Sequence, residues 1–331
     1  ALTDAGRTAQ QNAIAAQEQV EAKIAEAAPE ASVRYSYSLL LNGIALECAY
    51  GHIAELEALP GVKAVHMVQT YELPTEPKVT SGGGMIGAPT AWNLGMDGSG
   101  MVVAVLDTGL DTDHAAFAVD PKSPAVVRGD IDEILSADTL QAQRLVRDLS
   151  SSSVYLSGKV PYVFDYADHD TDVNHHGGSD HGTHVAGIAT ANRYVENADG
   201  TYTYADNGVV GVAPDAQVVV MKVFGKNGGA YADDYIAAIE DAIVLDCDSV
   251  NLSLGSSTVG FTTDSENEYV NNVMASLNET DTVVCISAGN SGNWAEDSVN
   301  GLLFAEDSNT GRVGSPGSYA CLLYTSDAAD D

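Results

Sequence analysis

Three polar residues of this chain stand where side chains can meet to do chemistry. Asp107 ends the apolar run 101–106, His181 opens a helical pattern, and Asn290 follows the apolar run 282–287. A carboxylate can fix the tautomer of an imidazole, which then takes the proton of a hydroxyl nucleophile. An amide side chain can stabilise a developing oxyanion. Asp107 alone would fit a simple turn former, but with His181 it supplies two thirds of a nucleophile-activating set.

The elements that must position these residues are read from the apolar pattern. Near-continuous apolar runs are typical of central parallel strands covered on both faces. They occur at 101–106, 217–223, 249–253 and 282–287. Helical patterns lie between them at 182–192, 232–245 and 267–277. The pattern predicts an α/β fold with a doubly wound, mostly parallel sheet, in which chemistry gathers at the carboxyl ends of the strands.

The residues before this sheet predict a different arrangement of helices and strands. Residues 5–28 predict an amphipathic helix, 33–48 a hairpin with a two-residue Asn42-Gly43 turn, 52–59 a short helix and 62–68 a strand. Residues 1–72 therefore predict a small α+β domain, followed by a Pro- and Gly-rich linker at 73–84. Between about 115 and 160 we expect a surface insertion with one helix at 131–145.

Charge and composition exclude several classes of protein. The 331 residues include 14 Lys+Arg and 47 Asp+Glu, which gives a net charge of −33 and excludes nucleic acid as a partner. Hydrophobic residues make up 45% of the chain, enough for a sizeable core. No apolar run is long enough for a transmembrane segment, and no signal peptide opens the sequence.

Four motifs in order make the chain resemble the subtilisin-family serine proteases. They are the segments 103–109, 181–187, 251–255 and 287–290. The resemblance covers roughly residues 85–320, a partial peptidase domain. Within this family, the chain looks most like the large secreted, lactocepin-like cell-envelope endopeptidases. The segment 160–168 supports this narrower resemblance. Residues 1–72 resemble the inhibitory propeptide of these enzymes.

The resemblance implies roles for individual residues. Asp107 matches the orienting acid, His181 the general base and Asn290 the oxyanion donor. Residues that match the substrate-binding segments are Ser253, Leu254 and Gly255 at the specificity pocket, and Gly228 and Gly229 at the edge that pairs with an extended substrate. The implied protein is a secreted or cell-envelope zymogen that hydrolyses protein or peptide substrates, with its own propeptide as an intramolecular inhibitor.

The sequence departs from the family at the nucleophile. The family's serine lies in a Gly-Thr-Ser motif that follows the asparagine, and no Gly-Thr-Ser occurs in this chain. Ser326 is rejected because no helical pattern follows it. We therefore expect a fragment that is inactive as it stands, with residues 321–331 an artefactual tail. One alternative is a non-catalytic homologue that binds extended peptides, and another is a metal- or carbohydrate-binding α/β protein.

No cofactor is required for the implied chemistry, and no metal ligand is assigned. Family members often bind structural Ca²⁺ through an aspartate at the place of Ala116, so calcium is not supported at the usual position. An acidic run at Asp165, Asp168, Asp170 and Asp172 fits either a Ca²⁺ site or a solvated loop, and we favour the loop. For the neighbouring His169, His175 and His176 we also favour a surface loop.

Overall fold

The computed structural model describes most of the chain. The described residues are 4–72, 86–174, 179–193, 195–199, 202–203, 209–226, 228–255, 268–289 and 316–317. The predicted linker at 73–84, the predicted tail at 321–331 and Asn290 lie outside them.

A five-stranded parallel sheet forms the centre of the molecule. Its strands, in spatial order, are β11 (Val283–Ile286), β10 (Ser249–Leu252), β4 (Val102–Asp107), β8 (Gln217–Lys222) and β5 (Tyr162–Asp165). Four of them are the predicted apolar runs. Their parallel pairing confirms the predicted doubly wound α/β sheet.

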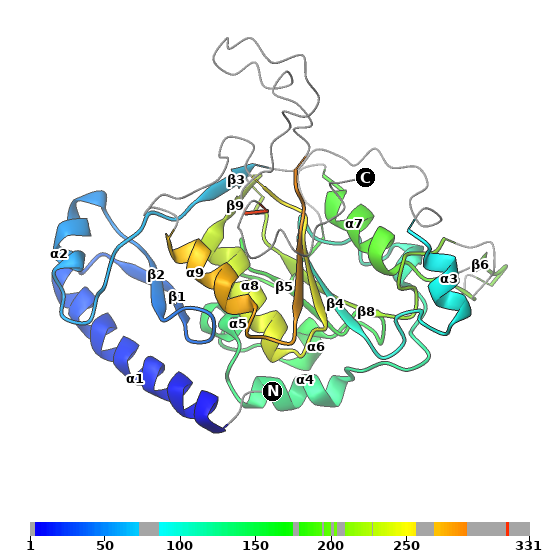
Figure 1. The fold of residues 1–331 in the computed structure, drawn as a ribbon, viewed down its shortest axis with the longest axis horizontal. Helices are drawn as coiled ribbons and strands as arrows, with labels where there is room; N and C mark the ends of the chain where they lie inside the picture. The colour runs from blue at the N-terminus through cyan, green and yellow to red at the C-terminus, as the bar shows by residue number, and fades with distance from the viewer. Residues whose placement is uncertain are drawn as a thin grey trace, which may run out of the picture.

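Helices cover both faces of this sheet (Figure 1). Ala104 and Leu106 of β4 pack in the cluster that contains α8 (Ala232–Val244) and α9 (Glu268–Leu277), whereas Val105 packs in the cluster of α7 (His181–Thr190). Alternate strand residues therefore serve opposite layers. Within the described part of the chain, no helix is both long and apolar enough to cross a membrane.

The remaining elements of the sheet domain and of the insertion are short. They are η2 (Ala115–Phe117), α3 (Ala88–Asn93), β6 (Val195–Glu196), β7 (Tyr202–Thr203) and β9 (Gly229–Tyr231) in the sheet domain, and α4 (Arg128–Ser136), α5 (Gln141–Leu145) and α6 (Ser151–Val154) in the insertion. The first 72 residues supply α1 (Asp4–Ala27), β1 (Ser32–Tyr37), β2 (Gly43–Glu47), η1 (Tyr50–His52), α2 (Ile53–Glu57) and β3 (Thr70–Glu72).

Residues 4–72, called here the N-terminal unit, lie beside α8 and α9 (Figure 1). The predicted hairpin is present, but the predicted two-residue turn is wrong because β1 and β2 are joined by the longer loop 38–42. The main-chain N–H groups of Ser38, Leu39 and Leu40 donate to the carboxylate of Glu240 on α8, at 3.4, 3.1 and 2.9 Å. A tight turn would not present three donors to one carboxylate.

The strand predicted at 62–68 is also wrong. No ladder forms there, and the strand begins later, as β3, which pairs antiparallel with β9. Val65 and Val68 instead pack as partly buried side chains against apolar clusters. A strand needs a neighbouring edge to pair with, and the chain meets that edge only at Thr70.

The insertion contains three helices, α4, α5 and α6, where one was predicted at 131–145, and it is not confined to the surface. The chain turns at Asp138, which has a φ of 51°, between α4 and α5. The carboxylate of Asp241 on α8 accepts the first main-chain N–H groups of α5, from Gln141 at 2.6 Å and Ala142 at 3.0 Å. The Gln141 side chain donates to the carbonyl oxygen of Ser36 on β1 at 3.0 Å. The insertion thus connects α8 with the N-terminal unit.

Arg34 of β1 joins the N-terminal unit to the first turn of α8. Its guanidinium donates to Asp233 and to Asp234, both at 2.8 Å. Asp234 is fully buried and also accepts the Tyr35 hydroxyl at 2.7 Å. Two carboxyl groups face one guanidinium, so burial, together with repulsion from Asp233, raises the pKa of Asp234 to about 8.

This raised pKa predicts that the contact between β1 and α8 weakens as the pH rises. A carboxyl group whose pKa is raised from its ordinary value to about 8 stabilises the docked state fully at low pH, and that contribution is lost as the pH rises through about 8. Hydrogen exchange of the β1 amides should therefore quicken more steeply with pH than intrinsic exchange does. Asp234→Asn should flatten this dependence and Asp138→Asn should not; identical profiles for the two variants would contradict the assignment.

Candidate active site

Asp107 and His181 meet at the carboxyl end of β4. The Asp107 side chain is 1% exposed, and its Oδ1 lies 2.8 Å from Nδ1 of His181, the first residue of α7. The same Oδ1 accepts the main-chain N–H of Thr108 at 2.7 Å. A carboxylate facing Nδ1 favours the tautomer with its proton there, which leaves Nε2 free to accept one. The structure therefore brings together two of the three predicted catalytic residues, while the third, Asn290, lies outside the described residues.

Two glycines leave room for close main-chain contacts at the carboxyl end of β4. A Cβ atom at Gly182 would lie 2.2 Å from the carbonyl oxygen of Gly109, and one at Gly109 would lie 2.1 Å from that of Val173. Gly109 also has a φ of 112°, which favours glycine. The Gly182 N–H donates to the Thr108 hydroxyl at 2.9 Å. The first turn of α7 is thus fixed against the strand end that carries the acid.

The predicted substrate-binding residues follow neighbouring strands at the carboxyl end of the sheet, where Asp107 and His181 meet. Ser253, Leu254 and Gly255 come directly after β10, whose Leu252 pairs with Leu106 of β4. Gly228 and Gly229 come after β8, whose last residue pairs with Asp107. All five therefore lie on the side of the sheet that carries the Asp107–His181 pair.

The edge formed by β9 is already paired within this chain. Glu72, Tyr71 and Thr70 of β3 pair antiparallel with Gly229, Ala230 and Tyr231. Figure 1 shows β3 and β9 together at one end of the sheet domain. The end of the N-terminal unit thus occupies the edge that the family resemblance predicts for an extended substrate.

The acidic run beside β5 is neither a solvated loop throughout nor a cluster of unpaired carboxylates. Asp165 is fully buried and accepts the Lys222 ammonium, which also donates to Asp168 at 3.0 Å. Burial raises the pKa of Asp165, and the hydrogen bond from Lys222 opposes that change. The predicted loop interpretation is therefore wrong at Asp165. Nε2 of His169 lies 3.3 Å from Arg34, while His175 and His176 are outside the described residues.

Calcium does not fit at the position that the family resemblance indicates. Ala116 is 2% exposed there, and its side chain has no oxygen to bind a hard cation. In the described ranges, no group of three or more His, Cys, Asp or Glu side chains could hold a metal ion.

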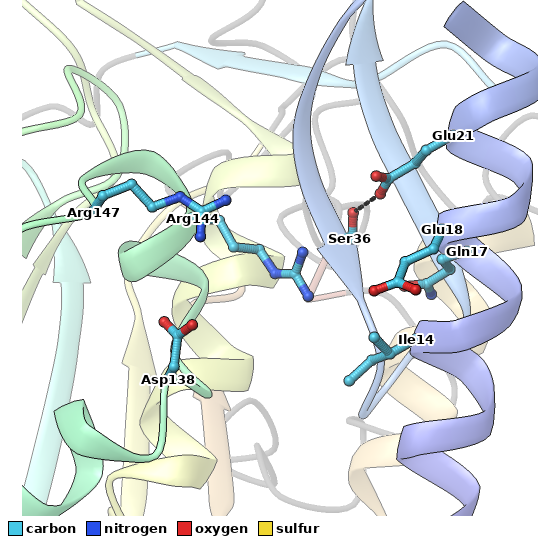
Figure 2. A pocket seen from close by; sticks show the side chains of 8 residues that line it. All are labelled: Ile14, Gln17, Glu18, Glu21, Ser36, Asp138, Arg144 and Arg147. Atoms are coloured by element: carbon cyan, nitrogen blue, oxygen red, sulfur yellow. Dashed lines mark hydrogen bonds between the residues drawn. The ribbon is translucent and has the colours of Figure 1, made fainter.

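A cavity of about 370 Å³ lies elsewhere, between α1 and the insertion (Figure 2). The residues that line it are Ile14, Gln17, Glu18, Glu21, Ser36, Asp138, Arg144 and Arg147. It contains no candidate catalytic or substrate-binding residue. It therefore belongs to the contact between the N-terminal unit and the insertion.

Sequence reasoning missed two charged residues that organise the surroundings of the site. Lys222 ends the continuous apolar run of β8, whereas Glu240 lies on α8 together with three other acidic residues and gives no such signal; both are 1% exposed. A charged residue inside a continuous apolar pattern needs a buried partner, because an unpaired charge is costly in the interior. That pattern was a usable signal, although the partners could not be named from it.

Comparisons with known proteins show the family of this chain. Residues 98–328 match the Peptidase S8 model, described as the subtilase family, and this chain belongs to that family. It is 34% identical over 313 residues to the PIII-type proteinase of Lactococcus lactis subsp. cremoris (strain SK11). The aligned stretch covers 92% of this chain and 14% of that protein.

Two further relatives share shorter stretches. The minor extracellular protease Vpr of Bacillus subtilis (strain 168) is 27% identical over 255 residues, 71% of this chain and 25% of its own length. The C5a peptidase of Streptococcus pyogenes serotype M3 is 32% identical over 166 residues, 50% of this chain and 13% of its own length. The chain therefore spans a quarter or less of these relatives.

The close approach of α7 predicts different effects for two glycines of the same helix. Gly182→Ala should lower the free energy of unfolding by about 2 kcal/mol, because its Cβ would overlap the Gly109 carbonyl group. Gly187→Ala should be neutral or stabilising by up to about 1 kcal/mol, since nothing lies within 4 Å of its Cβ. Urea unfolding measures both. Equal stabilities of the two variants would show that the backbone contact does not constrain α7.

Proposed function

We propose that this chain is part of a serine endopeptidase precursor that cleaves peptide bonds through an acyl-enzyme. The observation that carries the proposal is the buried 2.8 Å contact between Asp107 and His181 in a chain of the subtilase family. In this proposal Asp107 orients the imidazole, His181 takes the proton of a serine hydroxyl, and Asn290 donates to the oxyanion.

The proposed mechanism needs a serine that the sequence does not supply in the expected motif. No Gly-Thr-Ser occurs among the 331 residues, and we therefore expect this chain alone to hydrolyse nothing at an enzymatic rate. The remaining groups would still bind and orient a peptide. No cofactor is needed for these steps, because the proton moves between side chains and the peptide alone.

We further propose that the N-terminal unit is an intramolecular inhibitor of the peptidase domain. The pairing of β3 with β9 supports this, since it fills the edge proposed for an extended substrate. The three donors that the 38–40 segment directs at Glu240 give the unit a second attachment on α8. Removal of the unit would open the edge.

The substrate class and compartment follow from the same geometry and from the relatives. A strand edge recognises main-chain groups, so we propose protein or extended peptide substrates with side-chain preference set at Ser253, Leu254 and Gly255. A relative named an extracellular protease and the net charge of −33 support action outside the cell or at its envelope.

The general-base role predicts a large loss of activity in the full-length gene product. His181→Ala should lower kcat for a peptide substrate by about 10⁴, because loss of a triad member removes proton transfer. His184→Ala, one turn further along α7, should change it by less than about tenfold. A similar small effect of both variants would contradict the role of His181. If the wild-type protein binds peptides without cleaving them, the non-catalytic alternative is correct.

The inhibitor role predicts earlier activity when the attachment at Glu240 is weakened. In the full-length gene product, Glu240→Ala leaves three main-chain N–H groups of the 38–40 segment without their acceptor and should shorten the lag before peptide hydrolysis. Glu279→Ala, at an exposed position, is the matched control. A lag that is the same in both variants and in the wild type would contradict the proposed inhibition.

A further inference from the structure

A buried lysine lies between the C-terminal end of α7 and the segment that leads into β8. Lys159 precedes β5 and is 0% exposed. Its ammonium donates to three main-chain carbonyl oxygens, those of Thr190 at 2.5 Å, Pro214 at 3.0 Å and Ala216 at 2.6 Å. An ammonium has three protons, so its donor capacity is fully used.

The three carbonyl groups belong to segments that this lysine links. Thr190 is the last residue of α7, where carbonyl groups lack helical partners and carry the negative end of the helix dipole. Pro214 and Ala216 precede β8. A Cβ atom at Gly211 would lie 2.5 Å from the main-chain nitrogen of Ala191, so this segment runs directly against the end of α7.

Carbonyl oxygens converging on one point resemble the surroundings of a bound metal cation. Here the point is occupied by a charge that belongs to the chain. Burial lowers the pKa of Lys159 to about 7, while the nearby carboxylate of Asp215 favours the charged form. The carbonyl groups favour it too, because a neutral amine has only two protons for three acceptors.

A chain of hydrogen bonds connects the ammonium with Ala116, the position where the family resemblance indicates a calcium ligand. The carbonyl oxygen of Ala116 accepts the main-chain N–H of Asn192 at 2.9 Å. The Asn192 side chain donates at 3.1 Å to the carbonyl oxygen of Pro214, which also accepts Lys159. The chain thus has a methyl group in place of a carboxylate at 116, and three hydrogen bonds in series connect that residue with a cation of the chain's own.

We propose that Lys159 is a built-in cation that replaces a structural metal ion at the end of α7. It is a positioning residue, because its contacts are at the opposite end of the helix from His181. The ammonium binds the helix end to the 211–216 segment and so fixes the axis along which α7 presents His181 to Asp107. This inference concerns the fold of the chain itself and does not depend on the proposed peptidase activity.

Chemical rescue in the full chain tests the proposal. Lys159→Ala should lower the melting temperature by roughly 5–10 °C, since the carbonyl groups lose their cation. Methylammonium chloride should restore several degrees in a saturable manner, because the small cation fits the vacated space. The same salt should not change the wild type or Lys226→Ala, whose lysine side chain is 50% exposed.

A second variant separates charge from volume. Lys159→Met fills the space without a charge, so it should be destabilised and insensitive to methylammonium. The low-field proton NMR signal of His181 Nδ1 should weaken in Lys159→Ala and return with methylammonium. The proposal is overturned if methylammonium does not restore Lys159→Ala, if Lys159→Met melts like the wild type, or if the His181 signal is the same in every variant.

A measurement on the wild-type chain covers the case in which neither variant folds. Hydrogen exchange of the Asn192 and Val212 amides, which bond across the end of α7, should be unchanged by EDTA. Loss of protection at these two amides in EDTA, reversed by Ca²⁺, would show that a metal ion holds the segment and would overturn the proposal.

Discussion

The contact between the backbone of α7 and the end of β4 is the constraint on which the candidate site depends. Gly182 has room for the carbonyl group of Gly109 but for no Cβ atom of its own, and the Thr108 hydroxyl accepts a hydrogen bond from the Gly182 N–H at 2.9 Å. This contact fixes the position of His181, because His181 is the residue before Gly182. The imidazole therefore faces Asp107.

Buried acids of α8 determine where the other parts of the chain attach. Glu240 accepts the loop of the N-terminal hairpin, Asp241 accepts the first N–H groups of α5, and Asp233 and Asp234 accept Arg34. Each carboxyl group is desolvated and each meets donors from another segment, so these contacts are directional as well as attractive. One helix thus orients the hairpin, the insertion and the sheet relative to one another.

The parts that could be predicted from the sequence are those set by local pattern. Apolar runs predicted the central strands. The strand-end position of Asp107, the small residues of the helix that His181 opens, and the resemblance to the family motifs together predicted that Asp107 and His181 would meet. The strand at 62–68 was wrong because pairing depends on an edge supplied by Gly229–Tyr231, far along the chain. The partners of Glu240 and Lys159 could not be predicted either, because they also lie far along the chain. The role of Asn290 stays a prediction.

The pairing of β3 with β9 has a kinetic consequence. Since both strands belong to one chain, β3 occupies that edge at an effective concentration on the order of millimolar, whatever the concentration of the protein. If a free peptide binds this edge as proposed, it can do so only during the fraction of time that the pair is open, and its apparent Kd rises by the inverse of that fraction. Dilution cannot release β3, but a cut in the connecting chain would make its return bimolecular and therefore slow at low concentration.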